Sequence, residues 1–129
     1  MIEAPDGSAA YWMTAAVRDL RSARLLLDDG DSDGAANRGY YAMFHAATAA
    51  FAQHGHIVKT HDGLVGQFGR RFVETGLVPR ELGRALNVAL ELRCASDYTM
   101  APPPHDRVER LLADAEAFVA AIRALLDRA

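Results

Sequence analysis

The spacing of apolar residues constrains the fold of this chain more than any other feature. Apolar side chains recur at intervals of three and four along most of the sequence, and β-branched residues are sparse. Intervals of three and four place side chains on one face of an α-helix, whereas a half-buried strand needs an interval of two. The sequence therefore predicts an all-α protein.

Acidic, glycine-containing and proline-containing segments divide this pattern into five amphipathic helices. We expect these helices at about 9–28, 33–54, 60–75, 79–98 and 106–127. Ser32 or Asp33 is expected to cap the second helix, Gly76 to end the third, and Pro79 to lie in the first turn of the fourth. Short connections favour antiparallel neighbours, so the predicted architecture is a five-helix up-and-down bundle.

Length and composition are typical of one packed domain, which we expect to cover residues 1–129. Of the 129 residues, 50% are hydrophobic and 24% are charged, and the net charge is -3. The negative charge argues against tight, sequence-independent binding to duplex nucleic acid. Cys94 is the only cysteine, no apolar run is long enough to span a membrane, and we see no leader. We therefore expect a cytoplasmic protein that does not contact membranes.

The second helix carries the residues with the clearest chemical potential. Arg38 and His45 are seven positions apart, so they return to one helix face on the order of 10 Å apart along the axis. A phosphate group between them would be held by Arg38 while His45 moves a proton. The alternative is that Arg38 forms a salt bridge to a neighbouring helix and His45 is hydrogen-bonded at a helix interface.

No cofactor or metal site is expected. The closely spaced glycines of the third helix do not form a phosphate-binding loop, because no strand precedes them. His54, His56 and His61 with Asp62 lie around a connection, without the ligand spacing typical of zinc sites.

Three blocks of sequence together resemble the HEPN family (higher eukaryotes and prokaryotes nucleotide-binding domains), in particular its small stand-alone prokaryotic branch. The blocks are residues 37–47 (NRGYYAMFHAA), residues 59–61 (KTH) with 68–72 (FGRRF), and residues 91–98 (ELRCASDY). The resemblance spans roughly residues 11–125. It implies an all-helical domain that usually forms a homodimer.

The resemblance also implies an activity and partners. Many such proteins are metal-independent ribonucleases whose site lies between two protomers, and they are toxins neutralised by a small nucleotidyltransferase antitoxin. Active members carry an arginine, then four to six residues, then a histidine; Arg38 and His45 enclose six. The implied function is therefore a ribonuclease toxin, or its inactive descendant, with Arg38 and His45 as the catalytic pair.

Five further residues are candidates for binding the RNA. In a ribonuclease site, Asn37 would orient the backbone or the sugar, and Tyr41 would hydrogen-bond the His45 ring or stack on a base. Tyr41 alternatively packs at a helix interface. Arg93 and Asp97 have the spacing of a surface ion pair; the resemblance favours the alternative that Arg93 joins Arg38 in one anion site, which Tyr98 closes.

A second class of function uses the same cleft without breaking a bond. In this alternative, the protein is a non-catalytic module that binds a nucleotide or docks a nucleotidyltransferase. Cleavage of RNA in EDTA, lost on substitution of His45, separates the two classes.

Overall fold

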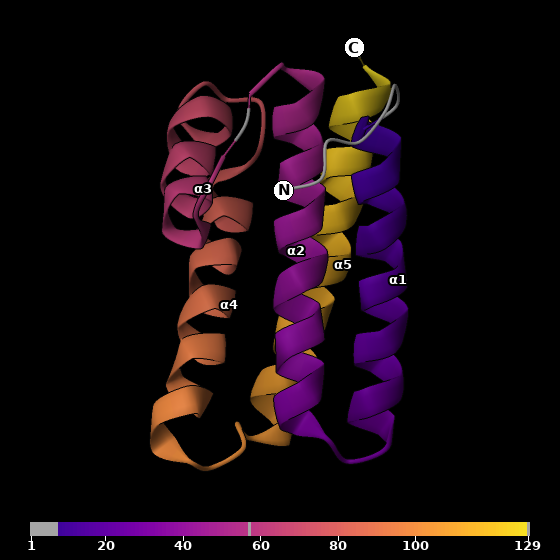
Figure 1. Cartoon of the computed structure of the whole chain (residues 1–129), viewed down its shortest axis with the longest axis vertical. Helices are drawn as coiled ribbons and strands as arrows, with labels where there is room; N and C mark the ends of the chain where they lie inside the picture. The colour runs from indigo at the N-terminus through magenta and orange to yellow at the C-terminus, as the bar shows by residue number, and fades with distance from the viewer. Residues whose placement is uncertain (1–7, 57, 129) are drawn as a thin grey trace.

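The computed structural model describes residues 8–56 and 58–128, without the side chains of residues 96–99. Within these residues every regular element is helical and no strand occurs, which confirms the predicted all-α class. The chain runs up and down a bundle (Figure 1). The elements are α1 (Ser8–Asp28), α2 (Ser32–Gln53), α3 (His61–Phe68), the π-helical turn η1 (Gly69–Val73), α4 (Arg80–Thr99) and α5 (His105–Asp127).

Helix α2 is the centre of the bundle. Helices α1 and α5 pack on one side of it, and α3 and α4 lie on the other (Figure 1). Its buried residues point in nearly every direction around the axis, and most of them are alanines. Small side chains let several helices approach one helix closely.

Gly39 lies at a close contact between α2 and α5. A Cβ atom at this position would overlap Cδ2 of Leu111 and lie 2.8 Å from Cδ2 of Leu112. Both leucines are buried on α5. Glycine therefore allows α5 to pack directly against the segment of α2 that carries Arg38.

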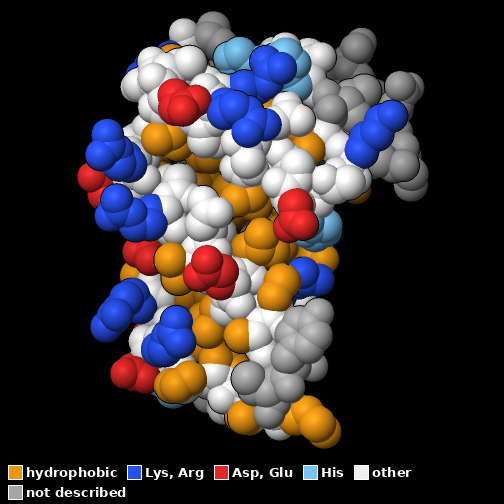
Figure 2. Space-filling model, turned by 90° about the vertical axis from the view of Figure 1, so that its left-hand side faces the viewer, with side chains coloured by type: hydrophobic (Ala, Val, Ile, Leu, Met, Phe, Trp, Pro, Cys, Tyr) orange, Lys and Arg blue, Asp and Glu red, His pale blue; other side chains and the backbone are white. Residues whose placement is uncertain are grey.

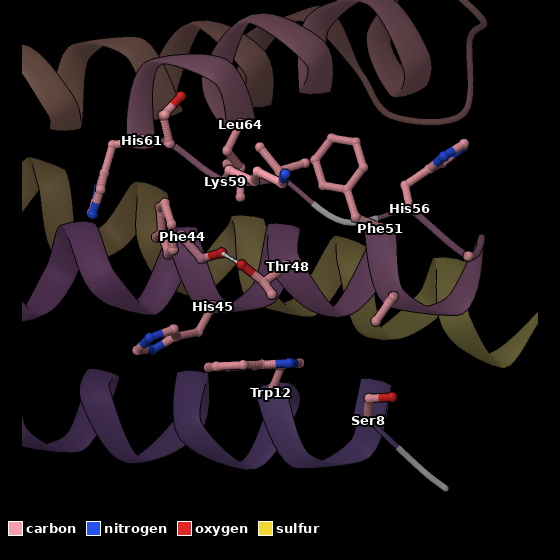
Figure 3. Close-up of a pocket in the computed structure, with 14 residues that line it drawn as sticks. Ser8, Trp12, Phe44, His45, Thr48, Phe51, His56, Lys59, His61 and Leu64 are labelled. Atoms are coloured by element: carbon pink, nitrogen blue, oxygen red, sulfur yellow. Dashed lines mark hydrogen bonds between the residues drawn. The ribbon is translucent and has the colours of Figure 1, made fainter. Parts of the chain in front are cut away.

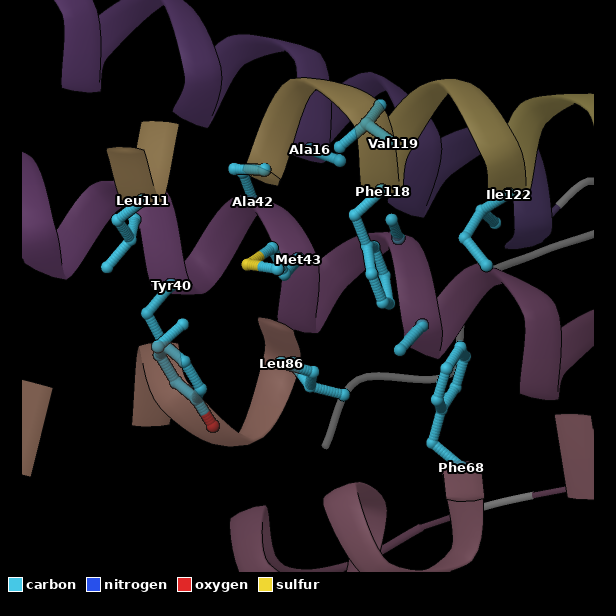
Figure 4. Close-up of a cluster of buried hydrophobic side chains, with 14 of the residues drawn as sticks. Ala16, Tyr40, Ala42, Met43, Phe68, Leu86, Leu111, Phe118, Val119 and Ile122 are labelled. Carbon is cyan, nitrogen blue, oxygen red and sulfur yellow. The ribbon is translucent and has the colours of Figure 1, made fainter. Parts of the chain in front are cut away.

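Larger side chains from four elements fill the core beside α2 (Figure 4). Tyr40 and Met43 of α2, Phe68 of α3, Leu86 of α4 and Phe118 of α5 are all fully buried. The rings of Phe68 and Phe118 lie 5.2 Å apart between centroids. This contact joins the two sides of the bundle into one hydrophobic core, which holds α2 in place.

The structure corrects two predicted helix starts. Asp31, and not Ser32 or Asp33, caps α2, because its Oδ1 accepts a hydrogen bond from the backbone N–H of Gly34 at 2.8 Å. Pro79 is the residue before α4 rather than a member of its first turn.

The third predicted helix is divided in the structure. The α-helical part ends at Phe68, and the chain continues as a π-helical turn in which the Glu74 N–H donates to the Gly69 carbonyl at 2.9 Å. Gly76 then ends this segment as predicted, with φ of +81°. No helix among the described residues combines the length and the hydropathy that crossing a bilayer requires.

Candidate functional site

Asp19 of α1 bridges Arg38 and His45 of α2. Nη1 of Arg38 lies 3.2 Å from Oδ1 of Asp19, and Nδ1 of His45 lies 2.6 Å from Oδ2. Asp19 is only 7% exposed and is one of two buried polar residues among those described. A carboxylate thus lies between the two side chains where the sequence suggested a phosphate, and Arg38 does form a salt bridge to a neighbouring helix.

The carboxylate determines which nitrogen of His45 is available. An ionised carboxylate only accepts hydrogen bonds, so Nδ1 of His45 carries the proton that points to Asp19. Within the described residues, no hydrogen bond uses Nε2. The ring also stacks on Trp12 of α1, with centroids 5.3 Å apart and planes 27° from parallel. Asp19 and Trp12 together fix the orientation of the imidazole, and Nε2 is left to accept or donate a proton.

Arg38 is held by three contacts. Its Nε and Nη2 atoms donate to Oδ1 of Asn37 at 3.2 and 3.0 Å, in addition to the Asp19 bond. Its guanidinium carbon lies 4.9 Å from the centroid of the Tyr41 ring. The side chain remains 36% exposed. Asn37, predicted to orient a sugar or the backbone, therefore positions Arg38 in this structure.

Tyr41 connects this group to α4. Its hydroxyl accepts a hydrogen bond from Nη2 of Arg93 at 3.4 Å, and the guanidinium carbon of Arg93 lies 5.3 Å from its ring centroid. Its ring centroid lies 5.7 Å from that of His45, and its hydroxyl bonds Arg93 rather than the histidine. The fold thus joins five predicted site residues into one group, in which Arg38, His45 and Arg93 lie around Tyr41 and Asn37 bonds Arg38.

Two predicted site residues lie outside the described part of the structure. The side chains of Asp97 and Tyr98 are not described. Their expected roles, an ion pair with Arg93 and closure of the anion site, therefore stay predictions.

His61, at the start of α3, borders the same region from the opposite side. Its Nδ1 lies 2.8 Å from the hydroxyl of Tyr40, and its ring stacks on Phe44 with centroids 4.3 Å apart. Burial, helped by the positive charge of Arg93, lowers the pKa of His61. Burial also raises the pKa of Tyr40. The Tyr40 hydroxyl therefore donates to a neutral His61 ring at neutral pH.

The other histidines considered in the sequence have separate partners. Nδ1 of His54 lies 2.9 Å from the carbonyl oxygen of Ala50, and Nε2 of His56 lies 2.9 Å from Nη1 of Arg71. In the described part of the chain, no three His, Cys, Asp or Glu side chains gather as a metal site requires.

A cavity of about 410 Å³ opens beside His45 (Figure 3). It lies between α1, α2 and the segment that leads into α3. Its walls are mainly aromatic and aliphatic, and the described residues that line it include no acidic side chain. Trp12, Phe44, His45, Lys59, His61 and Leu64 are among its lining residues.

Sequence reasoning missed Asp19 and gave His61 no part in the site. Asp19 is 26 positions from His45 and belongs to no motif with it. His61 was considered in the sequence as a possible metal ligand and as part of the 59–61 block of the family resemblance. For Asp19 the one available signal was its helical spacing from Trp12 and Ala16, which places it on the same face of α1 as these two residues.

Comparison with known proteins finds a family profile and relatives that match most of the chain. The HEPN domain profile matches residues 9–125. A protein of Thermotoga maritima described as a UPF0332 protein is 35% identical over 118 residues, which are 91% of this chain and 89% of the relative. A protein of Methanocaldococcus jannaschii bearing the name "Putative toxin MJ0605" is 32% identical over 111 residues, 86% of this chain and 83% of the relative.

A third relative, a UPF0332 protein of Archaeoglobus fulgidus, is 33% identical over 108 residues, 78% of this chain and 86% of the relative. These matches extend over most of both partners in each pair. The profile match includes all of the residues placed around Tyr41. The chain therefore belongs to the HEPN domain family.

Proposed function

We propose that this protein is an RNA-directed HEPN domain that cleaves RNA without a metal ion and acts as a toxin. The observation that carries the proposal is the pair of bonds from Asp19 to Arg38 and His45. They hold a cation and an oriented imidazole side by side. The name of the Methanocaldococcus jannaschii relative supports a toxin.

The proposed reaction is transphosphorylation of the RNA backbone. The 2′-hydroxyl loses its proton and its oxygen forms a bond to the adjacent phosphorus, while the bond from phosphorus to the 5′-oxygen breaks and that oxygen takes up a proton. The products are a 2′,3′-cyclic phosphate and a 5′-hydroxyl. Nε2 of His45 carries out the proton transfer, because Nδ1 is committed to Asp19. Arg38 offsets the charge that develops on the phosphate.

In this proposal the protein acts as a homodimer. Hydrophobic side chains form a band down the face on which α3 and α4 lie (Figure 2). Leu77, Val88 and Met100 are large exposed hydrophobic residues among those described, and an exposed apolar band marks a site of association. Sedimentation of wild type and Val88→Glu tests this: the wild type should sediment as a dimer and the variant as a monomer.

A small nucleotidyltransferase is the partner that the HEPN resemblance implies for such a toxin in the cytoplasm. Expression of this protein alone should arrest growth, and a nucleotidyltransferase encoded beside it should relieve the arrest. Arrest that the neighbouring protein leaves unchanged would contradict this pairing.

Cleavage of RNA in EDTA by wild type and His45→Ala tests the activity. We expect the wild type to cleave and the variant to be inactive, because removal of the imidazole removes the proton transfer. Cleavage that EDTA abolishes, or that the variant retains, would overturn the proposal.

The contacts of Arg38 favour a second candidate, a non-catalytic module that binds a nucleotide or docks a nucleotidyltransferase. Three of its nitrogens already donate within the protein, to Asp19 and Asn37. Fewer donors then remain for a phosphate in a transition state. Absence of cleavage by either protein, together with nucleotide binding by the wild type, would support this candidate.

A further inference from the structure

The cavity beside His45 has the size and the walls of a small-molecule site. Its volume of about 410 Å³ falls in the range of about 300–1,000 Å³ that such sites occupy. Trp12, Phe44 and Leu64 give it apolar surfaces from three helices (Figure 3). The polar part of its lining consists of three histidines, two threonines, Ser8 and Lys59, which offer hydrogen-bond partners to the polar edges of a ring.

The cavity adjoins the group proposed to act on RNA. His45 belongs both to the Asp19 bridge and to the cavity wall. Trp12, which stacks on the His45 ring at 5.3 Å, is also a wall residue. A molecule bound against this wall therefore contacts the imidazole whose Nδ1 is held by Asp19.

We propose that this cavity binds one nucleobase of the RNA, next to the phosphate on which Arg38 and His45 act. The inference rests on the proposed function and extends it to a base-binding site. Proteins that bind single-stranded RNA stack unpaired bases on aromatic side chains. Trp12, Phe44 and His61 present such rings to the cavity.

The charges around the cavity suit a nucleotide. Lys59 is exposed at its edge, and no described lining residue is acidic. Its titratable lining groups are Lys59, His45, His56 and His61, all of which are neutral or positive. A base can enter the apolar part while the negative backbone that carries it stays near Lys59.

Trp12 makes the proposal directly measurable, because it is the only tryptophan of the chain. We would titrate the full-length protein with adenosine, guanosine, cytidine and uridine, and follow tryptophan fluorescence excited at wavelengths that nucleosides do not absorb. We expect a saturable change with at least one nucleoside. Ribose 5-phosphate, which has no base, should give none. Absence of a saturable change with all four nucleosides would overturn the proposal.

A cavity-filling variant links the site to cleavage. Ala52 lines the cavity, so Ala52→Phe should abolish the nucleoside response and lower RNA cleavage by about tenfold or more, an effect of about 1.4 kcal/mol. Ala120→Phe, at an exposed position of α5, is the matched control and should keep both. Cleavage at the wild-type rate by a folded Ala52→Phe protein would overturn the base site and leave the ribonuclease proposal intact.

Two further measurements separate the base-binding site from the ribonuclease activity. Nucleoside binding by a protein that cleaves no RNA would support the base site and overturn the ribonuclease. Trp12→Leu, with nucleoside binding measured by calorimetry, replaces Ala52→Phe if that variant does not fold. It removes a stacking surface without adding volume, and we expect it to weaken binding by about tenfold or more. Unweakened binding would overturn the proposal.

Discussion

Nδ1 of His45 and Oδ2 of Asp19 lie 2.6 Å apart, across the interface between α1 and α2. This bond joins a residue of the family motif to a residue outside it. The second oxygen of the same carboxylate binds Arg38. One buried side chain of α1 thereby fixes both the cation and the imidazole of the α2 motif, and the proposed chemistry depends on it.

Replacement of Asp19 by asparagine tests that dependence. The amide has the same shape, but its nitrogen donates a hydrogen bond, so it no longer holds the proton on Nδ1 of His45. We expect RNA cleavage to fall by about 10²–10⁴-fold. Initial rates of cleavage measure this effect, with Asp33→Asn, at an exposed position of α2, as the control. A cleavage rate near that of the wild type would show that Asp19 is only structural.

Replacement of Arg38 by lysine separates charge from geometry. Lysine keeps the positive charge, but its ammonium group lacks the planar fork of separate nitrogens through which Arg38 contacts Asp19 and Asn37. We expect KM for RNA to rise by about tenfold or more. Arg24→Lys is the matched control, because Arg24 also binds two carboxylates, those of Glu109 and Glu116, at the surface. Equal KM values in the two variants would contradict a specific role for Arg38.

The free energy of unfolding should depend on pH through His61. Burial and Arg93 lower its pKa in the folded protein from the ordinary value of 6.5. Below about pH 6.5, the unfolded chain therefore binds a proton that the folded protein does not. The contribution of His61 to the free energy of unfolding is therefore present above about pH 6.5 and is lost as the pH falls below that value.

Urea unfolding at about pH 7.5 and 5.5 measures this dependence. We expect His61→Phe, which keeps a ring against Phe44, to be less pH-dependent than the wild type. Tyr40→Phe removes the hydrogen bond to His61 but keeps the titrating ring, so it should retain a pH dependence. An unchanged slope in His61→Phe would assign the effect to other groups.

Gly39→Leu should destabilise the fold. The new side chain would collide with Leu111 and Leu112 of α5, and overpacking a core costs about 1–3 kcal/mol. Gly69→Ala is the control, because a Cβ atom there meets no atom within 4 Å and the backbone is helical. Alanine is the better helix former by about 1 kcal/mol, so Gly69→Ala should be neutral or stabilising. Chemical denaturation distinguishes the two outcomes.

Local sequence determined much of the helical framework. The recurrence of apolar residues at three and four predicted the helices, and the left-handed backbone that glycine permits explains the stop at Gly76. The cap of α2 was assigned one or two residues too late. Asp31, Ser32 and Asp33 all have side chains that cap helices, and the turn that follows α1 decides which of them reaches the free backbone N–H groups.

The sequence also predicted the α2 motif, because helical geometry alone places Arg38 and His45 on one face. The sequence did not predict the partners of these two residues. Asp19, Arg93 and His61 come from three other elements, and each meets α2 only because of how those elements pack and rotate against it. The sequence by itself determined which residues of α2 have chemical potential. Tertiary structure decided that a carboxylate lies between two of them, since the rotation of α1 about its axis is set by the packing of its whole buried face.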